Sequence, residues 1–306
     1  MPERRPHVAR RQALTSLAKP TAIRDAATVM LVRDDEAGGL EVFMLRRSLN
    51  SDFVGGAYVF PGGAVDEADR HDDLEAICDG RTAAECSELL GIASGGLAYW
   101  VASVRECFEE AGVLLARRHD EAVVSFLDPE AAARFQGHRD AVNQGTRRLA
   151  EVCAEEDLVV DAGAIHYFSH WITPEGPPRR YDTRFFVAAA PPGQVPLHDD
   201  AETIANVWIR PKMALEEHAA GRLDLIFPTI RNLQAIGRFA TAGELLDHAR
   251  RIEHVPAIMP RIVSDEGGMR ILIPGDAGYD EAGLGPLPLL DGPLPGRPGG
   301  PTVPAS

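Results

Sequence analysis

The sequence has few cysteines, no long apolar run and no excess of positive charge, and each absence excludes a class of protein. Its 306 residues hold only 4 cysteines (Cys78, Cys86, Cys107 and Cys153), which form neither a disulfide framework nor a Cys-x-x-Cys zinc pair. No stretch approaches the ~18 consecutive apolar residues of a membrane span. The basic N-terminal segment lacks the apolar core of a secretory signal. These features predict a cytoplasmic protein with reduced thiols and no membrane partner.

The charge balance is strongly acidic. The chain has 31 Lys+Arg against 46 Asp+Glu, a net charge of −15. Nucleic-acid and anionic-membrane binding need a basic surface, so we expect neither partner. An anionic small-molecule substrate stays open, because a bound metal ion can reverse the sign of the charge locally.

The composition divides the chain into three parts. Hydrophobic residues make up 45% and charged residues 25%, which is typical of a globular protein with a real core. We expect a basic arm over residues 1–22, a folded domain over 23–274 and a disordered Gly/Pro-rich tail over 275–306. Residues 70–96 are acidic and interrupt the domain as an insertion.

Hydrophobic patterning predicts alternating strands and helices, and therefore an α/β (α+β) fold. Residues 28–46 are expected to form a β-hairpin. Further strands are expected over 58–60, 165–172, 184–189, 203–209 and 270–273. Helices are expected over 82–90, 97–111, most of 129–157, 211–220, 229–239 and 242–251, and Gly112 is expected to end the second of them.

The segment Arg105-Glu106-Cys107-Phe108-Glu109-Glu110-Ala111-Gly112-Val113 carries the chemistry. On a helix, Glu106, Glu109 and Glu110 fall within about 100° of one another, so we expect them to converge on one open face. An apolar stripe on the opposite side faces a core; it consists of Val101, Val104, Phe108, Ala111 and Leu115.

Three neighbouring carboxylates repel one another, and a hard divalent cation would offset this repulsion. The alternative, from the helix alone, is a solvated acidic face.

An upstream segment favours the metal-binding interpretation over a solvated acidic face. It is Phe60-Pro61-Gly62-Gly63, whose glycines let the backbone approach a ligand closely. Together, these two segments resemble the signature of the Nudix hydrolase family. Gly63 fits its first glycine, and residues 105–113 fit its second half at every defined position. A chance match to five fixed residues is roughly one in a million per start.

Two departures from the family pattern stand out. Asp69 occupies the position of a family glutamate, and residues 70–104 separate it from Arg105, far more than the usual gap. Such an expanded box is similar to one subgroup, the peroxisomal coenzyme A diphosphohydrolases with a long insertion. Trp171-Ile-Thr-Pro174 and the segment Pro178 to Phe186 also resemble that subgroup. We expect the insertion to loop out.

The resemblance implies an αβα sandwich around a mixed sheet, with the insertion inside the Nudix box and extra helices near the C-terminus. It also implies hydrolysis of a diphosphate linked to another moiety, with Mg²⁺ or Mn²⁺ as cofactor. By positional match, the metal ligands and catalytic acids are Glu106, Glu109 and Glu110, and the Gly63 carbonyl is a further ligand. Arg105 is expected to brace the glutamates by ion pairing.

Other candidates lie outside the box. Glu202 occupies a position where relatives often carry an extra acid near the metal. Arg46 and Arg47 end a strand before the box and are candidates for binding phosphate, as are Arg179 and Arg184 beside a Pro-rich loop. The alternatives are that Glu202 is an ordinary loop acid and that the four arginines are structural or lie on the surface.

Three functions follow from these residues. The first is cleavage of coenzyme A or acyl-CoA. The second keeps the enzyme but changes the substrate to ADP-ribose, a dinucleotide or a nucleoside triphosphate. The third is a catalytically weak ligand-binding domain, suggested by Asp69 and the interrupted box. A homodimer is a further expectation.

Overall fold

The structure, a computed structural model, describes residues 22–49, 55–120, 122–175, 177–196, 202–265, 268–280 and 282. The predicted basic arm, except for its last residue, and most of the predicted tail lie outside these ranges. Among the described helices, none is both long and apolar enough to cross a membrane.

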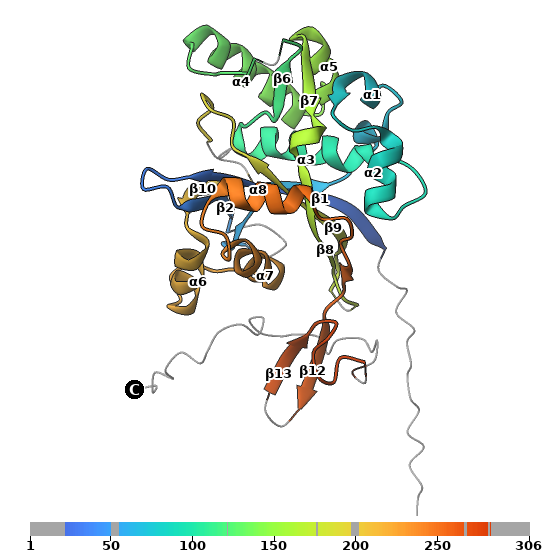
Figure 1. The fold of residues 1–306 in the computed structure, drawn as a ribbon, viewed down its shortest axis with the longest axis vertical. Coiled ribbons are helices and arrows are strands. Elements are labelled where there is room, and N and C mark those ends of the chain that lie inside the picture. The colour runs from blue at the N-terminus through green and yellow to red at the C-terminus, as the bar shows by residue number, and fades with distance from the viewer. Residues whose placement is uncertain are drawn as a thin grey trace, which may run out of the picture.

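A mixed β-sheet forms the middle layer, as predicted (Figure 1). Its strand order is β10-β2-β1-β9-β8-β11, with β3 paired to β2 and β4 paired to β1. The bounds are β1 (Ile23–Asp34), β2 (Leu40–Arg47), β3 (Tyr58–Val59), β4 (Gly62–Ala64), β8 (His166–Ile172), β9 (Arg180–Ala189), β10 (Thr203–Ile209) and β11 (Ala257–Ile258).

β1 is the central strand of this sheet. It runs parallel to β9 and antiparallel to β2 and β4. Its apolar, β-branched run is buried on both faces, which is typical of a strand covered by helices on each side. Val32 lies opposite Val42, which confirms the predicted hairpin.

Helix α3 (Leu97–Ala111) covers one face of the sheet and matches its predicted bounds. It ends at Gly112, whose φ of 66° lies in the left-handed region that favours glycine. Phe108 and Trp100 pack with Val29 and Phe186 in the core below the helix. This packing fixes the helix across β1.

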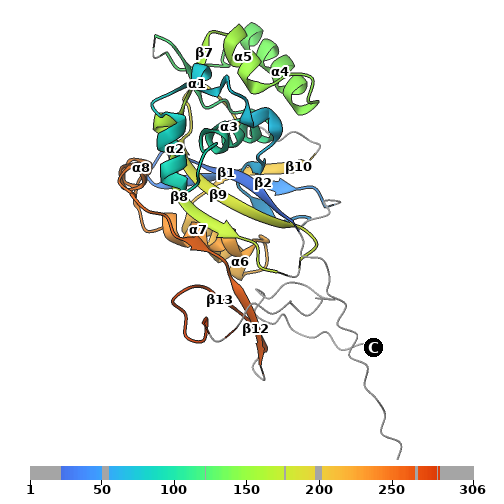
Figure 2. The ribbon, with the colours of Figure 1, turned by 90° about the vertical axis from the view of Figure 1, so that its right-hand side faces the viewer.

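The other face is covered by α6 (Pro211–Ala219), α7 (Phe227–Ile236) and α8 (Ala242–Arg250). Leu233 and Leu245 from these helices share a second core with Met30 and Met44 of the sheet. Figures 1 and 2 show the sheet between α3 on one side and α6 and α7 on the other. The predicted αβα sandwich is therefore confirmed.

The insertion does not loop out, so that expectation is wrong. It contains α1 (Leu74–Ile77), β5 (Cys78–Asp79) and α2 (Ala83–Leu90), and β5 pairs in parallel with β7 (Leu158–Asp161). β7 also pairs with β6 (Ala116–Arg118), and α4 (Pro129–Asn143) and α5 (Leu149–Glu155) complete this unit. We call it the outer unit. Its apolar side chains share the α3 core, and so it covers the side of α3 that faces away from the sheet.

Two further strands lie near the C-terminus. β12 (Arg261–Asp265) and β13 (Gly268–Leu272) form a hairpin that projects from the sheet in both views (Figure 2). Only the second of them was expected from the sequence.

Gly80 lies at the junction between the insertion and the rest of the outer unit, and its substitution tests how tightly this junction is packed. Its φ is 78°, and a Cβ there would lie 2.7 Å from the Cα of Gly163. We expect Gly80→Ala to lower the free energy of unfolding by about 2 kcal/mol or more. Alanine is strained in the left-handed backbone conformation, and its Cβ would also overlap with Gly163. Urea denaturation measures this.

Gly91→Ala is the matched control. Gly91 has a φ of 66°, and no atom lies within 4 Å of the place that an added Cβ would take. It should lose only about 1 kcal/mol, the backbone effect alone. Equal losses in the two variants would show that the junction is not tightly packed.

Candidate active site

The last two turns of α3 carry the three predicted acids. Glu110 is 5% exposed, and the side chains of Glu106 and Glu109 are 13% and 14% exposed. The expected open face is therefore nearly closed. The reason is that the sheet covers one side of the helix and the outer unit covers the other.

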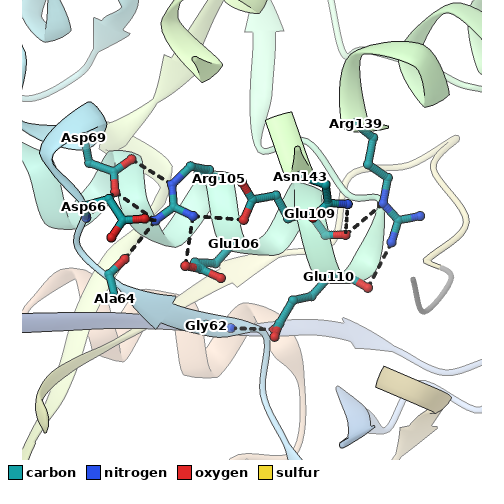
Figure 3. Close-up of polar contacts among 10 residues, drawn as sticks. All are labelled: Gly62, Ala64, Asp66, Asp69, Arg105, Glu106, Glu109, Glu110, Arg139 and Asn143. Carbon is teal, nitrogen blue, oxygen red and sulfur yellow. Dashed lines mark hydrogen bonds and ion pairs between the residues drawn. The ribbon is translucent and has the colours of Figure 1, made fainter. Parts of the chain in front are cut away.

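Arg105 is the centre of the polar network in Figure 3. Its Nη1 donates to Oε1 of Glu106 and to Oε2 of Glu109, both at 2.9 Å. Its Nη2 donates to the carbonyl oxygen of Ala64 at 2.8 Å. The prediction that Arg105 braces the glutamates is confirmed.

Asp69 holds the other side of the same guanidinium. Its two carboxylate oxygens accept from Nε and Nη2 of Arg105, each at 2.9 Å. Asp69 is 1% exposed and lies in the short 3₁₀ helix η1 (Glu67–Arg70). It therefore positions Arg105, a role that the sequence did not assign to it.

The glycines of β4 allow the acids to approach the sheet. The Gly62 N–H donates to Oε2 of Glu110 at 2.9 Å. A Cβ on Gly63 would lie 2.4 Å from Oε1 of Glu106, so no larger residue fits without moving this carboxylate. Glu106 and Glu110 thus both face the β4 backbone (Figure 3).

Arg139 of α4 holds the C-terminal end of the acidic helix. It is buried, and it donates to the carbonyl oxygens of Glu109 at 2.9 Å and Glu110 at 3.0 Å. Asn143 donates to the Glu109 carbonyl at 3.4 Å. Terminal helix carbonyls need such donors. Sequence reasoning missed Arg139, because nothing local indicates that α4 returns to this end of α3.

Burial disfavours the charged form of all three acids. It raises the pKa of Glu106 and Glu109, although Arg105 opposes the rise. It raises the pKa of Glu110 well above 4.5, and the nearby Glu106 raises it further, whereas the Gly62 N–H lowers it.

Two of the outlying candidates, Arg47 and Glu202, lie near this cluster, whereas Arg46 alternates with Met44 on β2 and so belongs to the opposite face of the sheet. The charge of Arg47 lowers the pKa of Glu110 and that of Glu202 raises it, so both side chains lie close enough to act. Glu202 is joined to the end of β2, where the Ser48 N–H donates to its carbonyl oxygen at 2.8 Å. Arg46 donates from Nε to the Gly56 carbonyl at 3.3 Å.

The structure places the other two arginines differently. Ala27 of β1 pairs with Gly63 on one side and with Arg184 on the other, so β1 separates Arg184 from the glycine strand. Arg184 is buried, pairs with Asp182 and lies 5.0 Å from the ring centroid of Tyr99. These contacts favour a structural role for it. Arg179 is exposed and directly precedes β9.

The described residues contain no group of three Asp, Glu, His or Cys side chains arranged to hold a metal ion. The three carboxylates are nevertheless neighbours, because the charge of Glu109 raises the pKa of Glu106 and that of Glu106 raises the pKa of Glu110. Arg105 holds Glu106 and Glu109, and Gly62 holds Glu110.

A solved Nudix hydrolase from Alicyclobacillus acidocaldarius superposes with a TM-score of 0.63 and 28% identity, covering 74% of this chain and 96% of that one. With the glycine strand and the acidic helix in contact, the class follows: the chain is a Nudix diphosphohydrolase.

Residues 82–236, just over half of the chain, match the NUDT19 Nudix domain, and the chain belongs to the NUDT19 Nudix family. The human acyl-coenzyme A diphosphatase NUDT19 is 31% identical over 282 residues, covering 81% of this chain and 75% of the relative. The Xenopus laevis protein of the same name is 27% identical, with 79% and 72% covered. The predicted family is thus confirmed.

Asp69 and Asp66 offer a matched test of the Arg105 network. Asp69→Asn should lower the free energy of unfolding by about 3 kcal/mol, because it removes the main partner of a buried charge. The Asp66 side chain is 63% exposed and lies 3.7 Å from the same guanidinium, so Asp66→Asn should change stability by less than about 1 kcal/mol. Urea denaturation of both variants measures the difference. Similar small losses would contradict the role assigned to Asp69.

Proposed function

We propose that this protein cleaves the diphosphate bond of coenzyme A or acyl-CoA, with Mg²⁺ or Mn²⁺ as cofactor. The observation that carries this proposal is the placement of Glu106 and Glu110 against the Gly62–Gly63 backbone, in a chain whose relatives bear the name acyl-coenzyme A diphosphatase.

The chemistry of the donor set fits a hard divalent cation. Carboxylate and carbonyl oxygens suit Mg²⁺ and Mn²⁺, and the buried acids resist ionisation without a counter-charge. Glu106, Glu110 and the Gly63 carbonyl would hold the metal, with Glu109 and Glu202 as further ligands. The metal would neutralise charge on the phosphate oxygens of the substrate.

The protein's own residues have separate tasks in this proposal. Arg105 holds Glu106 and Glu109 in place while Asp69 fixes Arg105. A carboxylate of the cluster orients or deprotonates the attacking water. Arg47, beside the cluster, binds a phosphate of the substrate, and Arg46 next to it in the chain is a further candidate for this role. The Asp69–Arg105 contact weakens the case for a catalytically weak domain, because the shorter acid still braces the network.

Location and assembly are part of the same proposal. The four cysteines are free, and burial raises the pKa of Cys78, Cys86 and Cys153 to about 12, so these thiols are unreactive. Free cysteines suit the reducing cytoplasm. The homodimer and the absence of nucleic-acid and membrane partners stay predictions.

Metal binding should depend on pH with a defined sign. Because the folded pKa of Glu106, Glu109 and Glu110 lies above 4.5, the folded metal-free protein loses stability as pH rises from 4.5 through the folded values. Mg²⁺ relieves this loss by favouring the ionised acids. We expect Mg²⁺ to raise Tm more at about pH 8 than at about pH 6. An equal rise at both values, measured by scanning calorimetry, would argue against these ligands.

Glu110→Gln tests catalysis. It keeps the shape of the side chain but removes its charge, and we expect turnover to fall by at least about 100-fold. Glu216→Gln is the control, because Glu216 is an exposed acid of α6 and should leave turnover unchanged. Near-normal turnover in Glu110→Gln would contradict the metal assignment.

A substrate panel identifies the leaving group. It contains coenzyme A, acetyl-CoA, ADP-ribose, NADH and a nucleoside triphosphate, each assayed with Mg²⁺ and with Mn²⁺. We expect coenzyme A to give 3′,5′-ADP and 4′-phosphopantetheine, identified by mass. Faster cleavage of ADP-ribose, NADH or the triphosphate would show that this compound, and not coenzyme A, is the preferred substrate. No cleavage of any compound would favour the ligand-binding alternative.

A further inference from the structure

A second pocket lies on the face of the sheet opposite the acidic helix. It has a volume of about 310 Å³, is open to solvent on one side, and is lined by residues of β8, α7, α8 and the segment that follows α8. α3 and α7 lie on opposite sides of the sheet in both views (Figures 1 and 2). The pocket is therefore separate from the site described above. Its volume is at the lower end of the range typical of small-molecule sites.

The rim of this pocket is basic. Arg231, Arg238, His248 and His254 line it, and no Asp or Glu is among its lining residues. This is unusual in a chain with a net charge of −15, where acids outnumber basic residues. The rim therefore attracts anions locally, against the charge of the molecule as a whole.

The two arginines keep donors available for a ligand. Arg231 donates from Nη1 to Oε1 of Gln234 at 2.9 Å, and Arg238 donates from Nε to the Ala235 carbonyl at 3.3 Å. Neither forms an ion pair with a carboxylate within the described residues. Both are exposed, so their guanidinium groups can turn to a carboxylate or phosphate.

The floor of the pocket is aromatic and apolar, with one unused donor. Trp171 is 5% exposed, and its Nε1 has no hydrogen-bond partner among the described residues. A buried donor without a partner destabilises the fold, and a ligand acceptor would relieve this. Phe168 and Ile258 provide apolar surface beside Trp171.

We propose that this pocket binds a small aromatic anion, with its ring on Trp171 and Phe168 and its phosphate or carboxylate between Arg231 and Arg238. The Trp171 Nε1 supplies a further donor to the same ligand. The ring is required because the floor is apolar, and the anion is required because the rim has only basic charges.

Phenyl phosphate is the probe, and isothermal titration calorimetry in EDTA is the measurement. EDTA removes divalent metal, so the result does not depend on the acidic cluster. We expect saturable binding with one site, and weaker binding of inorganic phosphate by about tenfold or more, since it lacks the ring. Equal affinities for phenyl phosphate and inorganic phosphate would overturn the proposal that the ring of the ligand packs on Trp171 and Phe168.

The double variant Arg231→Gln/Arg238→Gln locates the site. We expect phenyl phosphate binding to weaken about tenfold or more, because two charged donors are lost. The matched control is Lys212→Gln/Arg222→Gln, which removes two exposed basic charges from α6 and the turn after it and should bind normally. Equal binding by both double variants would overturn the proposal.

Catalysis separates this proposal from the proposed function. Arg231→Gln/Arg238→Gln should hydrolyse the best panel substrate at the wild-type rate, since both residues lie across the sheet from α3. A Trp171→Phe variant gives a second readout, with binding reduced by the loss of its donor while the apolar floor remains. Loss of hydrolysis in the arginine variant would show that the pocket belongs to the catalytic site.

Discussion

One buried guanidinium organises the acidic end of this molecule. Arg105 contacts Asp69 of the segment before the insertion, the Ala64 carbonyl of β4 and two glutamates of its own helix. Burial by itself lowers the pKa of Arg105, but the Asp69 hydrogen bond and the charges of Glu106 and Glu109 outweigh it and raise the pKa. The sheet, η1 and α3 are thereby held together at one charged point, so the positions of Glu106 and Glu109 depend on it.

The outer unit adds a second constraint. It packs on the side of α3 that faces away from the sheet, and Arg139 holds the helix end through the backbone carbonyls of Glu109 and Glu110. This enclosure makes ionisation of the three acids unfavourable. Acids that a solvated helix would leave ionised are instead driven toward the protonated form, and a cation is the natural counter-charge. The outer unit thus affects the electrostatics of the cluster as well as the fold.

The two faces of the sheet differ in the ionisable side chains that gather on them. The α3 face gathers buried carboxylates, whereas the pocket between β8, α7 and α8 is lined by Arg231, Arg238 and two histidines without any acid. The strands between them isolate the two environments. The proposed metal site and the proposed anion site therefore lie on opposite faces of one sheet.

The local sequence determined the elements and the family. The β-branched run of β1, the bounds of α3 and the stop at Gly112 follow from periodicity and backbone preference, and all were predicted. The resemblance also implied the bracing role of Arg105, and the structure shows its guanidinium paired with Glu106 and Glu109.

Only the tertiary structure decided what covers these elements. The pairing of β5 with β7 joins segments far apart in the chain, and no local pattern encodes such a partner. The roles of Asp69 and Arg139, and the pairing of Arg184 with Asp182, follow from that packing. Periodicity states which face of a helix is polar. The burial of that face depends on a second layer, whose position is set by long-range contacts.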